Sequence, residues 1–495
     1  MQGKAHEGPA VEYTELFARL AADGAMIERL SSDSRRSSAG VAFFAYPGEG
    51  ADGRAHIASA VAQGAAAVIW EEERFDWRPE WRVPNAPVRG LKQRAGAMAH
   101  EFYGRPSESL WMCGVTGTNG KTSCSHWVAA SLNQKNVASR VIGTLGSGIP
   151  GALQPALNTT PDALEVHRLL KEFVSQKAQA VAMEVSSHGL TQGRVNGIAF
   201  DCALFTNLSH DHLDYHGSMA AYAQAKALLF DTPGLGAAVL NLDDPLGAQL
   251  AERLNERGVR TIGYSLAGVP KGVQEFIAAR PAGPGRVQIE SSWGRGIAAI
   301  NQLGRFNTAN ALGVLGCLMA YGLPFREGTD LLGTLPPVPG RMEKISDRPL
   351  VVVDYAHTPD ALEKVLQALR PLADERGGRL LAVFGAGGDR DAAKRPLMGE
   401  VAARLADRVL VTSDNPRGED PLEIISQIEK GIAKAHEVEP DRALAIEQAV
   451  QAAALEDVLL IAGKGHEDYQ EIAGKRLPFS DAAVARATLA KRGAP

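Results

Sequence analysis

The sequence has 495 residues, which at roughly 150 residues per domain predicts about three domains. Hydrophobic residues make up 45% of the chain and charged residues 22%, and these globular proportions exclude a disordered or fibrous protein. The formal net charge of −5 is too small to indicate nucleic acid or an anionic membrane as a partner.

Two junctions divide the chain. Around Tyr103–Ser107 a helical pattern stops at Gly and Pro, and around Pro336–Gly340 three prolines prevent a helix from continuing. We therefore expect domains over residues 1–105, 106–337 and 338–495.

Within these domains, short apolar runs alternate with helical patterns. The runs predicted as buried strands are Leu110–Val115, Ala178–Val185, Cys202–Phe205, Leu350–Val353, Leu380–Phe384, Val409–Val411 and Val458–Ile461. Helices are predicted between them, for example over Asp360–Leu372 and Pro421–His436. The alternation predicts doubly wound α/β sheets, and the turns within Thr261–Gln302 predict antiparallel hairpins added to the middle domain.

The sequence also predicts a soluble, cytoplasmic protein. Residues 1–15 lack the apolar segment of a secretory signal. The uncharged stretch 306–325 has a fully apolar part of about 13 residues, a length typical of a buried core helix. The four cysteines lie far apart in the sequence and form no C-x-x-C, so we expect neither a disulfide framework nor a structural zinc site.

The strongest motif is VTGTNGKTS, Val115–Ser123, directly after an apolar strand and before a helical pattern. Successive backbone N–H groups, the helix N-terminus and the Lys121 ammonium make an anion cradle, and Thr122 is placed to reach a magnesium ion. Val115 stands where the strict phosphate-loop pattern has Gly. The alternative interpretation is a glycine-rich turn with a surface lysine.

Two further motifs carry metal-ligand side chains. Glu184 lies at the end of an apolar strand, where a magnesium carboxylate and a salt bridge are equally good interpretations. The run His210–His216 approaches the H-x-H-x-D-H pattern of binuclear zinc hydrolases, but Tyr215 adds one residue and breaks that spacing. We favour a role for His212 beside a magnesium–phosphate site over zinc.

Four loops in the last third follow predicted strands and carry charged or ionisable side chains. These side chains are Asp354, His357, Arg390, Asp414, Arg417 and Glu467. Ligands of open α/β sheets collect at such carboxyl-end loops. The mixture of guanidinium and carboxylate suits a zwitterionic, amino-acid-like ligand, although each charge taken singly fits a surface ion pair.

Taken together, these motifs resemble the Mur ligases of bacterial peptidoglycan synthesis. The resemblance covers essentially the whole chain, with the motifs in order: TGTNGKTS, NTTP, MEVSSHGL, TNLSHDHLDYHG, GRFNTANAL, PGRME, VDYAHTPD, GGDRD, DNPR and GKGHEDYQ. In this family DNPR is associated with members that add meso-diaminopimelate rather than L-lysine. A guanidinium at Arg417 can hold the distal carboxylate that lysine lacks.

The resemblance implies a three-domain ATP-dependent ligase: an N-terminal α/β domain for the uridine nucleotide, a central phosphate-loop ATPase domain and a C-terminal Rossmann-like domain for the amino acid. The implied reaction joins meso-diaminopimelate to the D-glutamate carboxylate of UDP-MurNAc-L-Ala-D-Glu through an acyl phosphate. ATP is the implied co-substrate, Mg²⁺ the cofactor and a monomer the implied state.

The family's residues carry over by motif. The implied catalytic residues are Lys121, Glu184, His212 and Lys226, and the implied metal ligands are Thr122, Glu184, His212 and Lys226 as a carbamate. The implied ATP site comprises Thr116, Gly117, Thr118, Asn119, Gly120, Lys121, Thr122, Asn307, Arg341, Asp354 and His357. The implied UDP-MurNAc-dipeptide site comprises Ser32, Ser34, Asn158, Thr159, Thr160, Ser186, Gln192 and Arg194, with the loop Glu49–Ala51 nearby. The implied diaminopimelate site comprises Arg390, Asp414, Asn415, Pro416, Arg417, Gly463 and Glu467.

Four other functions compete with this interpretation. An L-lysine-adding ligase or a folylpolyglutamate-synthase-like ligase shares the chemistry, but neither is expected to carry DNPR. A phosphate-loop NTPase switch does not need the amino-acid-type loops of the last third. A non-enzymatic binding module leaves the magnesium-type ligands around the phosphate loop unexplained.

Overall fold

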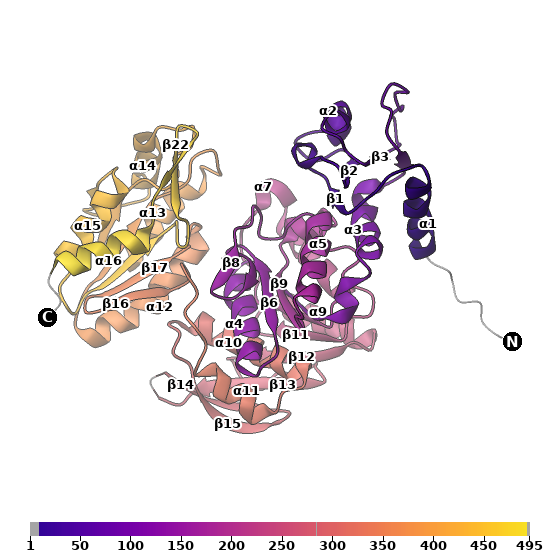
Figure 1. Ribbon diagram of the computed structural model, residues 1–495. Helices are drawn as coiled ribbons and strands as arrows, with labels where there is room; N and C mark the ends of the chain where they lie inside the picture. The colour runs from indigo at the N-terminus through magenta and orange to yellow at the C-terminus, as the bar shows by residue number, and fades with distance from the viewer. Residues whose placement is uncertain (1–8, 284, 493–495) are drawn as a thin grey trace.

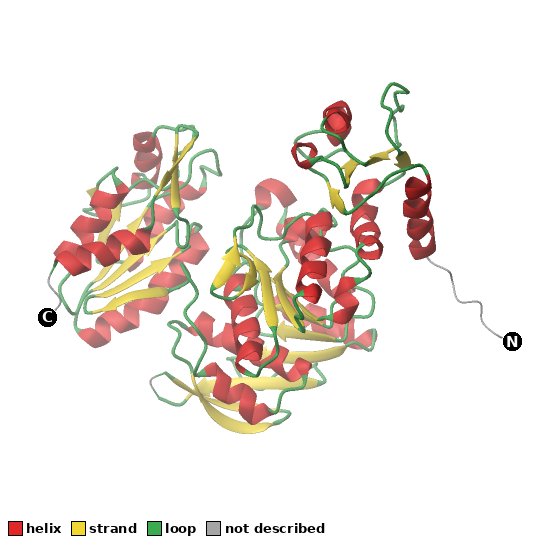
Figure 2. Cartoon of the chain, viewed as in Figure 1, coloured by secondary structure: helices red, strands yellow, loops and turns green. Residues whose placement is uncertain are grey.

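The computed structural model describes residues 9–283 and 285–492. Figures 1 and 2 show three mixed helix-and-strand units in chain order, with the C-terminal unit on the opposite side of the central one from the N-terminal unit. The predicted α/β class is confirmed. The sequence inference about a signal peptide falls partly on residues 1–8, which lie outside the described residues.

The N-terminal unit is a four-stranded parallel sheet in the order β1-β2-β3-β4. Its elements are α1 (Pro9–Ala22), β1 (Arg29–Ser31), β2 (Val41–Ala45), α2 (Ile57–Ala62), β3 (Ala67–Glu71), β4 (Asn85–Val88) and α3 (Leu91–Phe102). Because β2 and β3 are buried along their whole length, side chains from both faces form cores, one under α1 and α3 and the other under α2.

The central unit is built on an eleven-stranded sheet in the order β15-β14-β13-β12-β11-β10-β5-β9-β6-β7-β8. Its strands are β5 (Trp111–Thr116), β6 (Ser139–Gly143), β7 (Gly146–Ile149), β8 (Ala152–Gln154), β9 (Ala180–Glu184), β10 (Cys202–Phe205), β11 (Ala237–Asn241), β12 (Arg260–Ser265), β13 (Glu275–Pro281), β14 (Arg286–Ser291) and β15 (Gly294–Ala299). Its helices are α4 (Lys121–Gln134), α5 (Ala163–Ser175), α6 (Ser187–Thr191), α7 (Leu213–His216), α8 (Met219–Ala227), α9 (Pro245–Glu256), α10 (Arg305–Tyr321) and α11 (Phe325–Leu332).

The hairpins predicted within Thr261–Gln302 are correct only in part. Strands β13, β14 and β15 pair antiparallel, but β12 pairs parallel with both β11 and β13 and belongs to the main sheet. The reason is that β12 is buried nearly throughout, as a strand of a parallel sheet covered on both faces is. The uncharged stretch 306–325 forms the core helix α10, and no helix among the described residues is long and apolar enough to cross a membrane.

The C-terminal unit has a six-stranded sheet in the order β16-β17-β21-β18-β19-β20, parallel except for β16. Its strands, including a separate hairpin, are β16 (Glu343–Asp347), β17 (Leu350–Asp354), β18 (Leu380–Phe384), β19 (Arg408–Val411), β20 (Glu437–Val438), β21 (Val458–Ala462), β22 (Tyr469–Ile472) and β23 (Lys475–Pro478). Its helices are α12 (Pro359–Arg376), α13 (Lys394–Leu405), α14 (Pro421–Glu429), α15 (Arg442–Ala452) and α16 (Asp481–Lys491).

The predicted strands are found within a residue or two of their expected ends, whereas the predicted helix Pro421–His436 is too long. Helix α14 ends at Glu429 because the chain must pass close to α13. A Cβ on Gly431 would lie 1.8 Å from the carbonyl oxygen of Pro396, so only glycine allows this approach. Conversely, α12 continues past its predicted end at Leu372 to Arg376, where Gly377 caps it with a φ of +66°.

Candidate functional site

The predicted phosphate loop connects β5 to α4. Gly117 and Gly120 have φ values of +145° and +89°, and a Cβ on Gly117 would lie 1.9 Å from Thr206 Oγ1. Lys121 Nζ donates to the carbonyl oxygens of Gly117 at 2.8 Å and Thr118 at 2.9 Å, so its ammonium group lies over the loop. Burial lowers the pKa of Lys121. The loop thus has the cationic, N–H-rich geometry of an anion site.

The segment after β10 holds this loop in place. Asn207 accepts from the backbone N–H of Thr118 at 2.8 Å through its carbonyl oxygen and from that of Asn119 at 3.1 Å through Oδ1. Thr206 Oγ1 donates to the Asn119 carbonyl at 2.6 Å. Asn207 was not among the predicted site residues, although it lies in the quoted motif TNLSHDHLDYHG. The available signal was a polar residue shortly after a predicted strand, where ligands of open α/β sheets collect.

Two asparagines at the start of α10 lie beside the loop. A Cβ on Gly120 would lie 2.6 Å from Asn310 Oδ1, and Asn310 Nδ2 lies 3.4 Å from Asn307 Oδ1. The structure therefore places the predicted residue Asn307 at the loop and adds Asn310. A spacing of three residues puts both on one helix face, which could have identified Asn310 from sequence.

Glu184, at the end of β9, is fully buried and faces the loop. It accepts hydrogen bonds from Thr122 Oγ1 at 2.9 Å and from the N–H and hydroxyl of Thr144 at 2.8 and 3.1 Å. Arg341, which directly follows the junction between the central and C-terminal units, donates from Nη2 to Thr122 Oγ1 at 3.2 Å. Carboxylate and hydroxyl oxygens meet here, and these are ligands that magnesium prefers.

His212 and Lys226 both lie close to Tyr222. The His212 ring centroid is 6.1 Å from that of Tyr222, and Lys226 Nζ is 4.3 Å from the Tyr222 ring centroid. Lys226 is 1% exposed, and burial, followed by the charge of Lys121, lowers its pKa well below the ordinary value. Burial likewise lowers the pKa of His212. Lys226 is therefore a buried amine beside the phosphate loop rather than a surface lysine.

Three predicted ATP-site residues come from the C-terminal unit. The Arg341 guanidinium lies 4.5 Å from the ring centroid of Tyr355. Asp354, at the end of β17, is buried and accepts from the N–H groups of Met342 at 2.7 Å and Ala356 at 2.8 Å, which fixes the backbone next to Arg341. Burial lowers the pKa of His357, whose carbonyl accepts from a lysine of α13.

A chain of hydrogen bonds leads away from Glu184 through predicted dipeptide-site residues. Thr160 Oγ1 donates to the Glu184 carbonyl at 2.9 Å and lies 3.1 Å from Ser186 Oγ, which caps α6. Arg194 donates to the Thr160 carbonyl at 2.7 Å and to Gln192 Oε1 at 2.8 Å. These residues form one connected polar surface.

The same chain reaches the N-terminal unit. Gln192 Nε2 donates to Tyr215 Oη at 3.3 Å, and Tyr215 donates to Glu49 Oε1 at 2.5 Å. Ser32 hydrogen-bonds to the side chain of Tyr46, whose pKa rises to about 12 mainly through burial.

The other three residues predicted for the dipeptide site are Thr159, Ser34 and Asn158. Thr159 Oγ1 lies 3.0 Å from Thr144 Oγ1. Ser34 begins a short 3-10 helix next to Ser32, and Asn158 is exposed on the loop before Thr159.

The predicted amino-acid loops meet at the carboxyl ends of β19 and β21. Lys464, fully buried, donates to Asn415 Oδ1 at 2.9 Å and to Glu467 Oε2 at 2.8 Å, and Asn415 Nδ2 donates to Glu467 Oε2 at 2.7 Å. A Cβ on Gly463 would lie 2.4 Å from Asp414 Oδ2, so the two loops are in direct contact. Lys464 was not predicted, although it lies in the quoted motif GKGHEDYQ.

Arg417 projects beside the loop that follows β18. Its Nη1 donates to the Gly388 carbonyl at 2.7 Å, and its Nε lies 3.8 Å from Glu471 Oε2. A Cβ on Gly388 would lie 1.9 Å from the Pro416 carbonyl oxygen, so this loop packs against the DNPR segment. Arg390 is exposed in the same loop. The structure thus brings all seven predicted diaminopimelate-site positions to one edge of the sheet.

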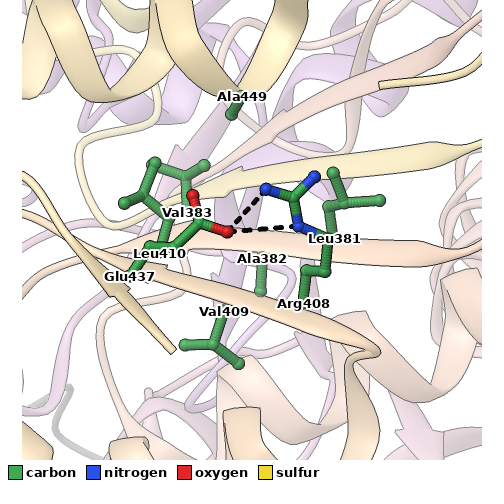
Figure 3. Close-up of a pocket in the computed structure, with 8 residues that line it drawn as sticks. All are labelled: Leu381, Ala382, Val383, Arg408, Val409, Leu410, Glu437 and Ala449. Atoms are coloured by element: carbon green, nitrogen blue, oxygen red, sulfur yellow. Dashed lines mark hydrogen bonds and ion pairs between the residues drawn. The ribbon is translucent and has the colours of Figure 1, made fainter. Parts of the chain in front are cut away.

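A small hollow on the C-terminal sheet lies outside this site. It is lined by Leu381, Ala382, Val383, Arg408, Val409, Leu410, Glu437 and Ala449, with Arg408 and Glu437 paired across it (Figure 3). None of the predicted site residues lines it.

The fold and site define a class of enzyme in which three α/β units combine a phosphate loop, a buried carboxylate and a cluster of charged loops at one edge of the C-terminal sheet. Three family models match the chain: "Mur ligase family, catalytic domain" over residues 26–103, "Mur ligase middle domain" over 115–318 and "Mur ligase, glutamate ligase domain" over 340–465. The chain belongs to the Mur ligase family.

Curated relatives are similar along nearly the whole chain. A protein of Pseudomonas aeruginosa named UDP-N-acetylmuramoyl-L-alanyl-D-glutamate--2,6-diaminopimelate ligase is 50% identical over 96% of this chain and 97% of its own length. A Janthinobacterium protein of the same name is 47% identical over 96% of each chain. A solved structure of a ligase with this name is 36% identical, with a TM-score of 0.66 over 94% of this chain and 95% of that one.

Proposed function

We propose that this chain is an ATP-dependent amide ligase that adds meso-diaminopimelate to the D-glutamate carboxylate of UDP-MurNAc-L-Ala-D-Glu, acting as a monomer in the cytoplasm. The observation that carries the proposal is the contact of Arg341 with Thr122. It connects the start of the C-terminal unit, which also carries the DNPR loop, to the phosphate loop of the central unit. Relatives named for this reaction are 47% and 50% identical over 96% of this chain, which supports the same assignment.

In this proposal the phosphate loop binds ATP. The loop N–H groups, the start of α4 and Lys121 hold the phosphates, and Lys121 stabilises negative charge that develops on the transferred phosphoryl group. The D-glutamate carboxylate attacks the γ-phosphate to give an acyl phosphate and ADP. The amine of diaminopimelate then attacks the acyl carbon, and phosphate leaves. Closure of the units around both substrates excludes water that would hydrolyse the acyl phosphate.

The donor set at the loop fits the Mg²⁺ that the family implies. Thr122 and Glu184 supply hard oxygens 2.9 Å apart, and Lys226 offers further oxygens only if its amine is carbamylated. His212 completes the proposed set. Bound there, Mg²⁺ would neutralise charge on the ATP phosphates.

We assign substrates by unit: UDP-sugar to residues 1–105, ATP to 106–337 and the amino acid to 338–495. The polar surface of Thr160, Arg194 and Gln192 lies between the ATP site and the N-terminal unit, where the muramoyl dipeptide has to lie for its carboxylate to reach the γ-phosphate. Arg417 would hold the distal carboxylate of diaminopimelate by bidentate pairing.

The test is phosphate release from ATP in the presence of UDP-MurNAc-L-Ala-D-Glu with meso-diaminopimelate, with L-lysine or with no amino acid. We expect release with diaminopimelate alone. Equal phosphate release with lysine would support ligase activity but reject the assignment of diaminopimelate as the specific substrate. Release without the muramoyl dipeptide would indicate a plain NTPase.

A further inference from the structure

Three of the four cysteines meet inside the central unit, although they lie far apart in the sequence. Cys113 on β5 and Cys202 on β10 are register partners on neighbouring parallel strands, and Cys317 on α10 packs above them. The Sγ atoms of Cys113 and Cys317 are 3.8 Å apart, and all three Sγ atoms lie within 4.8 Å of one another. All three thiols are fully buried.

The low polarity of the surroundings limits the net charge of any ligand that the three thiols can hold. The three thiols belong to an apolar core that also contains Val115, Leu204 and Val314. A net charge is costly to bury there. Zn²⁺ bound to three thiolates would leave one uncompensated negative charge and would lack its fourth ligand. A trivalent thiophilic element bound to three thiolates is neutral and needs no further ligand.

We infer that Cys113, Cys202 and Cys317 form a binding site for a trivalent thiophilic element, with arsenite as its probe. The condensation is As(OH)₃ + 3 RSH → As(SR)₃ + 3 H₂O: three As–S bonds form, three As–O bonds break, and each thiol proton leaves in a water molecule. Arsenic stays trivalent, so no oxidant or reductant is needed.

The site lies where three elements lead to the phosphate loop. Strand β5 runs from Cys113 to the loop. Strand β10 begins at Cys202, and Thr206, directly after its last residue, donates to the Asn119 carbonyl. Helix α10 carries Asn310 beside Gly120 on its first turns. Arsenic bonded to all three would fix β5, β10 and α10 to one another, so occupancy is expected to lower ATP turnover.

The test is intact-mass measurement of the full chain after incubation with sodium arsenite, with ATP turnover followed in parallel. We expect a mass gain of one arsenic less three hydrogens, at one arsenic per chain, and loss of activity over the same time course. Because the thiols are buried, a second sample is refolded from denaturant with arsenite present. Absence of the adduct in both samples would overturn the inference.

Cys124 supplies the matched control, since it is equally buried but outside the triad, with its Sγ 3.8 Å from the Asn310 carbonyl oxygen. Cys124→Ala is expected to keep the adduct, whereas Cys113→Ala, Cys202→Ala and Cys317→Ala each lose it. Thermal unfolding shows which variants are folded. An adduct that survives in a folded triad variant, or Zn²⁺ binding in preference to arsenite, would also overturn the assignment.

Discussion

Arg442 and Asp481 form an ion pair in which both side chains are fully buried, with Nη2 2.7 Å from Oδ2 and Nε 2.7 Å from Oδ1. The same guanidinium donates to the carbonyl oxygens of Ser413 at 3.1 Å and Ala462 at 2.9 Å. Ser413 lies in the loop after β19 and Ala462 is the last residue of β21, so one arginine connects the two loops of the proposed amino-acid site.

We therefore predict that Arg442→Met both destabilises the C-terminal unit and weakens amino-acid binding. Removing one partner leaves Asp481 as an unpaired buried charge, which typically costs about 3–5 kcal/mol. Urea unfolding measures this loss, and initial rates should show a higher KM for diaminopimelate with an unchanged KM for ATP. Arg408→Met is the control, because the half-exposed Arg408–Glu437 pair should contribute about 0–1 kcal/mol. Equal losses in the two variants would contradict the prediction.

Glu184→Gln should slow the chemical step more than it weakens ATP binding. The substitution removes a buried negative charge and turns an NH₂ group toward hydrogen-bond donors on Thr122 and Thr144. By analogy with removal of one preorganised electrostatic contact, we expect kcat to fall about 100-fold or more. Initial rates at saturating ATP measure it. Glu165→Gln, in a partly exposed pair with Arg168, provides the same chemical change away from the site and should leave kcat unaltered.

The sequence predicts the strands well because they follow a local rule, an apolar run of strand length. The candidate site loops are predicted from polar motifs at the ends of these strands. Local patterns do not predict the burial of Lys226, because α8 has little difference between its two faces and the lysine packs on Tyr222; only the family resemblance pointed to this residue. Nor do local patterns predict partners such as Arg442 and Asp481, or the meeting of Cys113 with Cys317. These contacts depend on how elements that are distant in the sequence pack together, and a local sequence pattern does not contain that information.

Lys226→Ala should abolish turnover while leaving the fold intact. Burial lowers the pKa of Lys226, so a neutral amine is available to react with CO₂ and form a carbamate. We expect wild-type protein incubated with ¹³C-bicarbonate to show a carbamate carbon signal by NMR, and Lys226→Ala to lack both the signal and activity. Lys344→Ala removes an exposed lysine and should change neither. Near-normal turnover in Lys226→Ala would eliminate the proposed metal-ligand role.

Arg417→Ala should lose preference for diaminopimelate over lysine. A hydrogen-bonded charged contact contributes about 1.5–3 kcal/mol, which corresponds to a fall of about 10- to 150-fold in kcat/KM for diaminopimelate. The rate with lysine should stay unchanged, since lysine has no distal carboxylate to lose a contact. Competition assays with both amino acids measure the ratio. Arg417→Lys keeps the charge without the bidentate geometry and should fall between the two proteins; an unaltered ratio in Arg417→Ala would reject this role.

Glu419 should make the C-terminal unit sensitive to acid. Its oxygens accept from Arg395 Nη1 and Nη2, both at 2.8 Å, and these hydrogen bonds lower the pKa of Glu419 to about 2. Since the folded pKa lies below the unfolded value of about 4.3, the stabilisation is present above that value and is lost as pH falls toward about 2. Urea unfolding of wild type and Glu419→Gln across this window should show wild type losing its advantage as pH decreases. A constant difference between the two proteins would show that the pair does not contribute to acid sensitivity.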